Sequence, residues 1–395
     1  MMSRKVIGKR TTKDGRHSPD KGILFFLIIM AVFGAIMIYD ASVYQANRLF
    51  KDQFYFFKSQ IVWLAIGGIL SFTAYIIDYK RILKLALPAL VVTIFLLLLV
   101  LIFGEDINGA KRWFQIGPLP TIQPAEFAKL AIIIYLSSWL GKKNYQYTGF
   151  TDSFKKGFLT NLAGFGAILG IVAVLVLLEP DLGTTMIICV TSFVMFFVSG
   201  RDMAHTVGSI AIILLFIPIV VLAAILEPYR LDRVKTYLNL IFTGNVADPR
   251  GSGYQMQQIL IGIGSGGLWG KGFGQSRQRF GYLVENTAFT DSIFAVLLEE
   301  LGLWGGALIV FSWIFFLWRG FKIALNVEDK EGQLLATGIT IWLSCQAFFN
   351  MAANVGLIPL TGIPLPFLTY GGSSTIVTMI AFGILLNISR YAKHT

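Results

Sequence analysis

Long apolar stretches without charged residues constrain this sequence more than any other feature. Residues 85–103, 157–178 and 203–226 contain no Asp, Glu, Lys or Arg. A helix of about 20 apolar residues crosses the hydrocarbon core of a bilayer, and these stretches have that length. Hydrophobic residues make up 55% of the 395, with a mean hydropathy of +0.69, more than a soluble domain of this length can bury. The sequence therefore predicts a polytopic α-helical membrane protein.

The apolar segments predict an all-α fold with ten transmembrane helices. We expect these helices at 22–41, 56–77, 82–103, 124–140, 158–178, 182–200, 204–226, 291–318, 334–356 and 366–389. They form one transmembrane domain over 22–391, preceded by a basic tail over 1–21. The outer-face connections are then 42–55, 104–123, 179–183 and 227–290. The last is long for a protein with otherwise short loops, and such loops are usually functional.

The positions of Lys and Arg predict the orientation. The net charge is +11, and seven of the 33 Lys and Arg residues lie within the first 21 positions. Basic residues favour the cytoplasmic side of a membrane, so the tail is predicted to be cytoplasmic. Ten spans return the C-terminus to the same side. This placement indicates an anchor in the cytoplasmic (inner) membrane and argues against a nucleic-acid partner.

Carboxylates are the candidate bases on the predicted outer face. The three histidines, His17, His205 and His394, fall in the tails or at the cytoplasmic face, so an outer site has no imidazole base or ligand. Cys189 and Cys345 lie in apolar runs and are interpreted as small hydrophobic residues, so we predict no protein metal site. The outer carboxylates are Glu105, Asp106, Glu126, Glu179, Asp181, Glu227, Asp232, Asp248, Glu285 and Asp291.

The segment "TDSIFAVLLEELG" carries three carboxylates into the eighth predicted helix. Asp291 has two interpretations: a first-turn residue that stabilises a helix capped by Thr290, or a catalytic base. Glu299 and Glu300 lie roughly 12–13 Å further along the axis, where a carboxylate facing lipid is costly. Both must face protein, a cation or a wet cavity. Glu299 falls near the Asp291 face of the helix, and Glu300 points roughly opposite.

The segment "QPAEFAKL" over 123–130 forms a second charged group. Glu126 falls in the first helical turn, and Lys129 lies on the same face three residues later. One interpretation is an ordinary helix start with a surface ion pair. The other is a charged pair at the outer mouth of a cavity, beside Lys111, Arg112 and Trp113.

The segment "GIGSGGLWGKGFGQSRQR" over 262–279 contains a literal G-x-G-x-x-G pattern. No strand precedes it, no βαβ unit surrounds it and no Walker A motif occurs, so nucleotide binding is not predicted. The segment is either a plain flexible loop or a loop in which Lys271, Arg277 and Arg279 hold a phosphate.

Together these motifs resemble those of the SEDS family (FtsW, RodA and SpoVE), membrane glycosyltransferases that polymerise peptidoglycan. The matching stretches are "NGAKRWFQIG", "QPAEFAKL", "EPDLGTT", "GYQMQQILIGIGSGGLWGKGFGQSRQ", "DSIFAVLLEELGLWGG" and "GLIPLTGIPLPFLTYGGSSTIVTMIAFGILLNISR". The resemblance extends from Gly22 to Tyr391. It implies that Asp291 is catalytic and that Glu126, Lys129 and Arg112 line the cavity. The further substrate-binding residues that we predict are Lys111, Lys271, Arg277 and Glu299, with Glu299 supporting Asp291 from inside the bundle.

The resemblance also implies the chemistry. A carboxylate takes the proton from the 4-hydroxyl of lipid II, which attacks the anomeric carbon of a lipid-linked glycan with inversion and releases undecaprenyl pyrophosphate. Arg, Lys or a divalent cation (Mg²⁺ or Mn²⁺) balances the leaving charge, and no nucleotide is required. The implied partners are lipid II, a class B penicillin-binding protein acting as transpeptidase, and other divisome membrane proteins.

Several stretches bear on the subtype and on alternatives. "FYFFKSQIVWLAIG" and "ILLNISR" favour the division member FtsW, whereas "TGIPLPFLTYGG" also suits the elongation member RodA. Many members have the sequence Pro-Glu-Ala-His-Thr-Asp before the catalytic helix. Here the corresponding stretch is "LVENTAFTD", with Phe289 in place of His and Val284 in place of Pro. This departure bears on the role of Glu285 and leaves that of Asp291 unchanged. A lipid II flippase and a scaffold for the transpeptidase are the alternative functions. Polymer formation from purified lipid II distinguishes all three.

Overall fold

The computed structural model describes residues 17–107, 110–115, 121–142, 159–200, 206–211, 214, 228–246, 248, 253–280 and 287–393. Its helices are α1 (Lys21–Phe50), α2 (Tyr55–Ile76), α3 (Tyr79–Lys84), α4 (Ala86–Phe103), α5 (Pro124–Gly141), α7 (Thr160–Leu178), α8 (Leu182–Ser199), α10 (Pro228–Thr243), α11 (Tyr254–Gly266), α12 (Ile293–Asn326), α13 (Lys330–Asn354) and α14 (Gly372–Ser389). Within these ranges, eight helices are long and apolar enough to cross a membrane: α1, α2, α4, α7, α8, α12, α13 and α14. The prediction of a multi-pass helical protein is thereby confirmed.

The predicted spans coincide with helices, with corrections. The seventh span, 204–226, lies mostly outside the described residues. The third span is broken at Leu85, which separates α3 from α4. The fold is not purely α-helical, because β1 (Glu105–Ile107) pairs antiparallel with β2 (Ala110–Trp113). The predicted outer loop 227–290 contains α10, α11 and the short 3-10 helix η2 (Gln278–Phe280), so much of it is helical.

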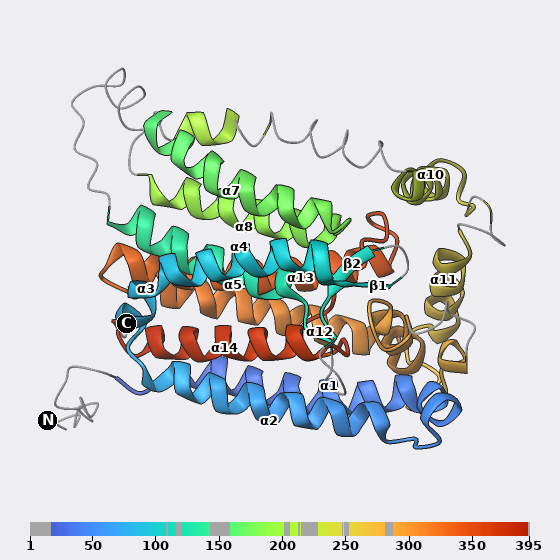
Figure 1. The fold of residues 1–395 in the computed structure, drawn as a ribbon. Helices are drawn as coiled ribbons and strands as arrows, with labels where there is room; N and C mark the ends of the chain where they lie inside the picture. The colour runs from blue at the N-terminus through green and yellow to red at the C-terminus, as the bar shows by residue number, and fades with distance from the viewer. Residues whose placement is uncertain are drawn as a thin grey trace, which may run out of the picture.

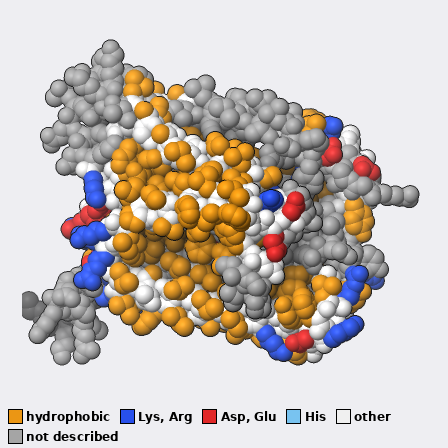
Figure 2. Space-filling view, viewed as in Figure 1, with side chains coloured by type: hydrophobic (Ala, Val, Ile, Leu, Met, Phe, Trp, Pro, Cys, Tyr) orange, Lys and Arg blue, Asp and Glu red, His pale blue; other side chains and the backbone are white. Residues whose placement is uncertain are grey.

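The helices run side by side as a bundle whose two ends differ (Figure 1). The hairpin β1–β2, α10 and α11 lie at one end. At the other end the start of α1 meets the end of α14, because the His17 N–H donates to the Arg390 carbonyl and the Asp20 N–H donates to Ser389 Oγ. A broad band of hydrophobic side chains covers the helices between these ends, with Lys, Arg, Asp and Glu gathered at the ends (Figure 2). This distribution is that of a protein that crosses a membrane.

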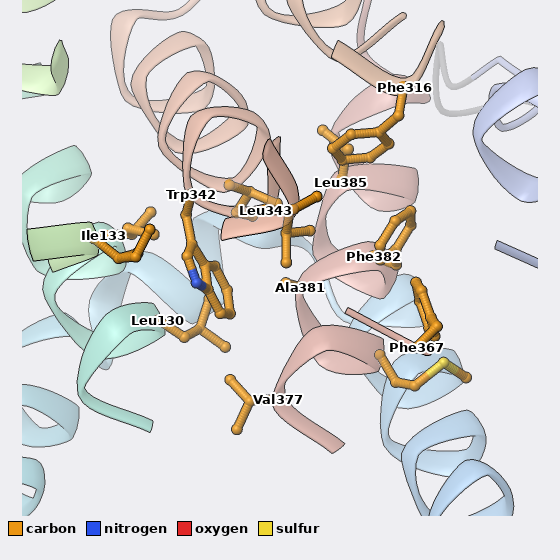
Figure 3. Close-up of a cluster of buried hydrophobic side chains, with 14 of the residues drawn as sticks. Leu130, Ile133, Phe316, Trp342, Leu343, Phe367, Val377, Ala381, Phe382 and Leu385 are labelled. Atoms are coloured by element: carbon orange, nitrogen blue, oxygen red, sulfur yellow. The ribbon is translucent and has the colours of Figure 1, made fainter. Parts of the chain in front are cut away.

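Helix α13 lies at the centre of the bundle. It contacts α5, α8, α11, α12 and α14, and most of its apolar window is buried. Around it, Trp342 and Leu343 pack among Leu130 of α5 and Val377 and Ala381 of α14 (Figure 3). Because neighbouring helices surround α13, its polar side chains meet protein groups rather than lipid.

Helix α12 is interrupted at Gly302, where φ is 67° and ψ is −168°. A Cβ at this position would lie 2.3 Å from the Gly270 nitrogen and 2.5 Å from the Leu268 carbonyl oxygen, so only glycine fits. The interruption frees carbonyls of α12, and the Glu299 and Glu300 carbonyls accept from the N–H groups of Lys271 and Gly272. The glycine-rich segment 267–280 is therefore bonded to α12 rather than forming a free loop.

Candidate active site

Asp291 lies in the turn that precedes α12. The helix begins at Ile293, and its N-cap residue Ser292 makes no side-chain capping bond. The interpretation of Asp291 as a first-turn residue capped by Thr290 is therefore wrong. Instead the Asp291 side chain accepts a hydrogen bond from the Thr290 hydroxyl at 3.2 Å. The carboxylate faces the segment around Gly362, where an added Cβ would lie 3.9 Å from Asp291 Oδ2.

Protein surrounds the Asp291 carboxyl, although the residue keeps partial solvent exposure. Burial raises the pKa of Asp291 above its usual value, and the positive charge of Arg233 opposes that rise. Arg233 belongs to α10 and donates to the Leu360 carbonyl at 2.7 Å. A carboxyl with a raised pKa that keeps some access to solvent suits a general base.

Glu126 and Lys129 form an ion pair within the bundle. Lys129 Nζ lies 2.7 Å from Glu126 Oε1, and both residues are 2% exposed. The surface-pair interpretation is therefore wrong. Lys129 also donates to Gln346 Oε1 at 2.9 Å and lies 5.5 Å from the centre of the Trp342 ring. The pair faces α13, and its role in lining a cavity stays a prediction.

Glu299 and Glu300 accept hydrogen bonds from the segment 267–280, although Glu300 Oε2 has no partner. Glu299 accepts from Lys271 Nζ at 2.6 Å and from Ser276 Oγ at 2.6 Å. Glu300 accepts from the Ser276 N–H at 3.0 Å and faces Asp40, which pairs with Arg279. Both carboxylates face protein, as expected. The side-chain donors to Glu299 are Lys271, Ser276 and Ser265 of α11, and its support of Asp291 stays a prediction.

The remaining predicted substrate-binding cations have other partners or face solvent. Arg112 donates from Nε to the Glu179 carbonyl at 2.7 Å and from Nη2 to the Pro180 carbonyl at 2.6 Å, so it fixes the turn between α7 and α8. Lys111 and Arg277 are exposed, whereas Lys271 is bound to Glu299. Glu285 lies outside the described residues.

The turn that Arg112 holds contains a second carboxyl with a shifted pKa. Burial, with a smaller contribution from the charge of Asp181, raises the pKa of Glu179 to about 8, and Arg112 partly offsets this. Asp181 itself accepts from the N–H and hydroxyl of Thr184 and so caps α8. These contacts give the turn a structural role.

Sequence reasoning missed the residues that hold Asp291 from the side of α13. Asn350 and Asn354 each donate to the Asp291 carbonyl, and Gln346 accepts from Lys129. These three amides recur every four residues within an otherwise apolar helix, and that spacing was visible in the sequence. Arg233 carried no comparable sequence signal, because its approach to Asp291 depends on how α10 packs.

Comparisons with known proteins agree with this architecture. The family described as "Cell cycle protein" (FTSW_RODA_SPOVE) matches residues 21–394. The chain belongs to the FtsW/RodA/SpoVE family. It is 41% identical over 387 residues to stage V sporulation protein E of Bacillus subtilis, covering 97% of this chain and 100% of that protein. It is 36% identical over 378 residues to a probable peptidoglycan glycosyltransferase FtsW of Geobacter metallireducens, covering 95% and 96%.

Solved structures of this family have the same fold. One, described as showing the coordination of polymerization and crosslinking by a peptidoglycan synthase complex, matches with a TM-score of 0.74 and 27% identity, covering 94% of this chain and 98% of that one. RodA of Thermus thermophilus matches with a TM-score of 0.67 and 26% identity, covering 95% and 98%. The family match and these relatives show that the chain is a multi-pass membrane enzyme of the peptidoglycan glycosyltransferase class.

Proposed function

We propose that the chain polymerises lipid II into β-1,4 glycan strands, with Asp291 as general base. The observation that carries the proposal is the contrast among its carboxylates. Glu126 and Glu299 are each bonded to a lysine. Asp291 has a fixed main chain, but its carboxylate accepts from an uncharged hydroxyl. Glu179 and Glu300 also have no lysine partner, but both are fully buried, whereas Asp291 keeps partial solvent exposure and can take a proton from a substrate.

The proposed step is an inverting glycosyl transfer. Asp291 takes the proton from the 4-hydroxyl of the terminal N-acetylglucosamine of lipid II while that oxygen bonds to the anomeric carbon of the growing glycan. The bond from this carbon to the pyrophosphate oxygen breaks on the opposite face, and undecaprenyl pyrophosphate leaves with the electron pair. General-base assistance of this kind contributes typically about 10²–10⁴-fold to the rate. The pyrophosphate is already activated, so no nucleotide enters the step.

A divalent cation is a separate part of the proposal. Within the described ranges, no three His, Cys, Asp or Glu side chains come close enough together to hold a metal ion. The protein donors therefore do not form a metal site by themselves, and we derive no step through one. Adding and chelating Mg²⁺ or Mn²⁺ during polymerisation tests whether the reaction needs an ion.

The proposed topology has ten spans, both termini in the cytoplasm and Asp291 at the outer face. The start of α1 and the end of α14 lie at one end of the bundle, and α10, which carries Arg233, lies at the other (Figure 1). A cysteine introduced at position 251 should react with an impermeant thiol reagent from outside, and one at 147 should not. The reverse labelling pattern would place the site on the cytoplasmic side and contradict the proposal.

We further propose that the chain acts during division with a class B penicillin-binding protein. The family resemblance and the FtsW relatives support this role, as does the solved complex that coordinates polymerization with crosslinking. A role in sporulation is the second candidate, favoured by the full-length match to stage V sporulation protein E. Complementation of strains lacking either the division member or the sporulation member separates the two roles. Copurification with the cognate transpeptidase, and stimulation by it, test the partner.

The decisive experiment uses the purified full chain and lipid II in detergent. Asp291→Asn keeps the shape of the side chain but removes its basicity, and glycan synthesis should fall by about 10²-fold or more. Asp232→Asn is the matched control, because Asp232 lies on α10 in an exposed pair with Lys235 and should tolerate the change. Normal polymer from Asp291→Asn would remove Asp291 from the mechanism. No polymer from the wild-type chain, with or without a transpeptidase, would favour the flippase or scaffold.

A further inference from the structure

Three amide side chains form a stripe along the central helix α13. Gln346, Asn350 and Asn354 are spaced by four residues, so they lie on one face with about 6 Å of axial rise between neighbours. All three are buried, at 0%, 2% and 1% exposure. Amides within a membrane-embedded bundle are costly unless they are hydrogen-bonded. We call these residues the amide ladder, and their partners show what it holds.

Two residues of the amide ladder donate to the main chain of Asp291. Asn350 Nδ2 donates to the Asp291 carbonyl at 2.8 Å, and Asn354 Nδ2 donates to the same oxygen at 2.9 Å. Asn350 also donates to the Ile363 carbonyl at 2.8 Å. Because Ile363 adjoins Gly362, which the Asp291 carboxylate faces, Asn350 holds both sides of that contact.

The preceding residues are held in the same way. The Phe289 carbonyl accepts from the Tyr370 N–H at 2.9 Å, and the Thr290 carbonyl accepts from Thr369 Oγ1 at 2.8 Å. Three successive carbonyls, at 289, 290 and 291, are thus fixed by donors from α13 and from the segment after it. The turn lies outside α12, so tertiary contacts must supply the order that a helix would otherwise give.

The third residue of the amide ladder, Gln346, connects the segment after α13 to the buried Glu126–Lys129 pair. Gln346 Nε2 donates to the Pro364 carbonyl at 3.1 Å, and Gln346 Oε1 accepts from Lys129 Nζ and from Trp342 Nε1, each at 2.9 Å. The ladder therefore joins the Glu126–Lys129 pair to the segment that Asp291 faces.

We propose that Asn350 and Asn354 are positioning residues that act on catalysis through the Asp291 carbonyl, an inference that rests on the proposed role of Asp291. Two donors on one carbonyl fix rotation about the adjacent backbone bonds, and this sets the direction in which the carboxylate points. A general base must lie within hydrogen-bond reach of the proton it takes, and displacements of about 1 Å cost up to about 10²-fold in rate. Loss of the Asn350 or Asn354 donor should therefore lower the turnover rate and have a smaller effect on the affinity for substrate.

The experiment measures kcat and KM for lipid II with the purified full chain. Asn354→Leu and Asn350→Leu retain side-chain size but remove the donors. We expect kcat to fall about tenfold or more, with KM within about twofold. Asn354→Gln restores an amide donor and should recover part of the rate. Asn387→Leu is the matched control: Asn387 is also buried and donates to a carbonyl, that of Tyr75 at 2.6 Å, but it lies near the end of α14 that meets the start of α1. It should lower thermal stability without lowering kcat.

Combination with Asp291→Asn separates failure of the ladder from failure of the base. If the ladder acts through Asp291, Asn354→Leu should have no further effect on the residual rate of Asp291→Asn. A further loss in that background, or a normal kcat in both leucine variants while Asp291→Asn is inactive, would overturn the ladder alone. Full activity of Asp291→Asn would overturn the proposed base itself. If Asn350→Leu does not fold, Asn354→Leu and its Gln counterpart decide the question.

Discussion

Two glutamate–lysine pairs have nearly the same geometry and different surroundings. Glu126–Lys129 closes at 2.7 Å and Glu299–Lys271 at 2.6 Å. The first is local to α5, and its lysine continues through Gln346 into the amide ladder. The second joins α12 to the segment 267–280, and Ser276 of that segment and Ser265 of α11 supply further donors. The same ion-pair geometry therefore occurs within one helix and between two segments of the chain.

The two pairs differ in whether both carboxylate oxygens of the glutamate have hydrogen-bond partners. Glu126 Oε2 is buried without a hydrogen-bond partner, whereas both oxygens of Glu299 accept bonds. Lys129 is 2% exposed at its side chain, and Lys271 is 29% exposed. The first pair thus has unused bonding capacity beside the segment that Asp291 faces. We expect its loss to reduce activity, and loss of the second pair to reduce stability.

The largest predicted effect separates activity from stability at the first pair. Lys129→Met leaves Glu126 as a lone buried charge, which typically costs about 3–5 kcal/mol. Adding Glu126→Gln should restore most of the stability, but polymerisation should stay at least about tenfold below wild type, since the contact with the ladder is gone. Thermal unfolding and lipid II polymerisation, measured on both variants, check this. Full activity of the double variant would show that the Glu126–Lys129 pair, like the Glu299–Lys271 pair, contributes to stability and not to activity.

The second pair should give the opposite result. Lys271→Met should destabilise the protein by about 2 kcal/mol, below the cost for a fully buried pair because Lys271 is partly exposed. Glu299→Gln with Lys271→Met should recover stability and retain polymerisation within about threefold of wild type, since the serine donors remain. A polymerisation defect at normal thermal stability would instead support the original prediction that Lys271 and Glu299 bind substrate.

The pH dependence of the rate sharpens the contrast at Asp291. A base works when deprotonated, so activity should fall as pH falls through the pKa of Asp291, which burial places above the ordinary aspartate value. Arg233 lowers that pKa, and therefore Arg233→Gln should move the acid limb of the kcat profile to higher pH. Tyr237→Phe is the control, because it removes a bond from the same helix to the Leu357 carbonyl without changing charge. An acid limb that does not move would show that Asp291 does not govern it.

The last prediction concerns stability, rather than activity, at the turn between α7 and α8. The pKa of Glu179 is raised to about 8 in the folded protein, against about 4.3 in an unfolded chain, so folding favours the protonated form. Stability from this group is present at low pH and is lost as pH rises through that window. Glu179→Gln should therefore gain thermal stability relative to wild type between about pH 5 and 8. A stability difference that stays constant across this range would contradict the assignment.

Much of the architecture could be predicted from local sequence. Apolar stretches of spanning length specify helices in a membrane because each backbone group must bond within its own segment. Glu126 and Lys129 fall on one face by helical spacing alone, and the need for buried carboxylates to meet protein placed Glu299 and Glu300 correctly in the interior. The N-terminal boundary of α12 was predicted less well, since the helix begins at Ile293 and so does not include Asp291.

Only the tertiary structure decided which charges act together. Lys271 and Glu299 are separated by 28 positions, and Asp291 and Asn354 by 63, and neither contact follows from a helical or strand period. The sequence places Asp291 just before an apolar helix, and this could be predicted because composition and periodicity are local properties. The direction of that carboxylate depends on donors that α13 brings to its main chain, and those donors are set by how the helices pack.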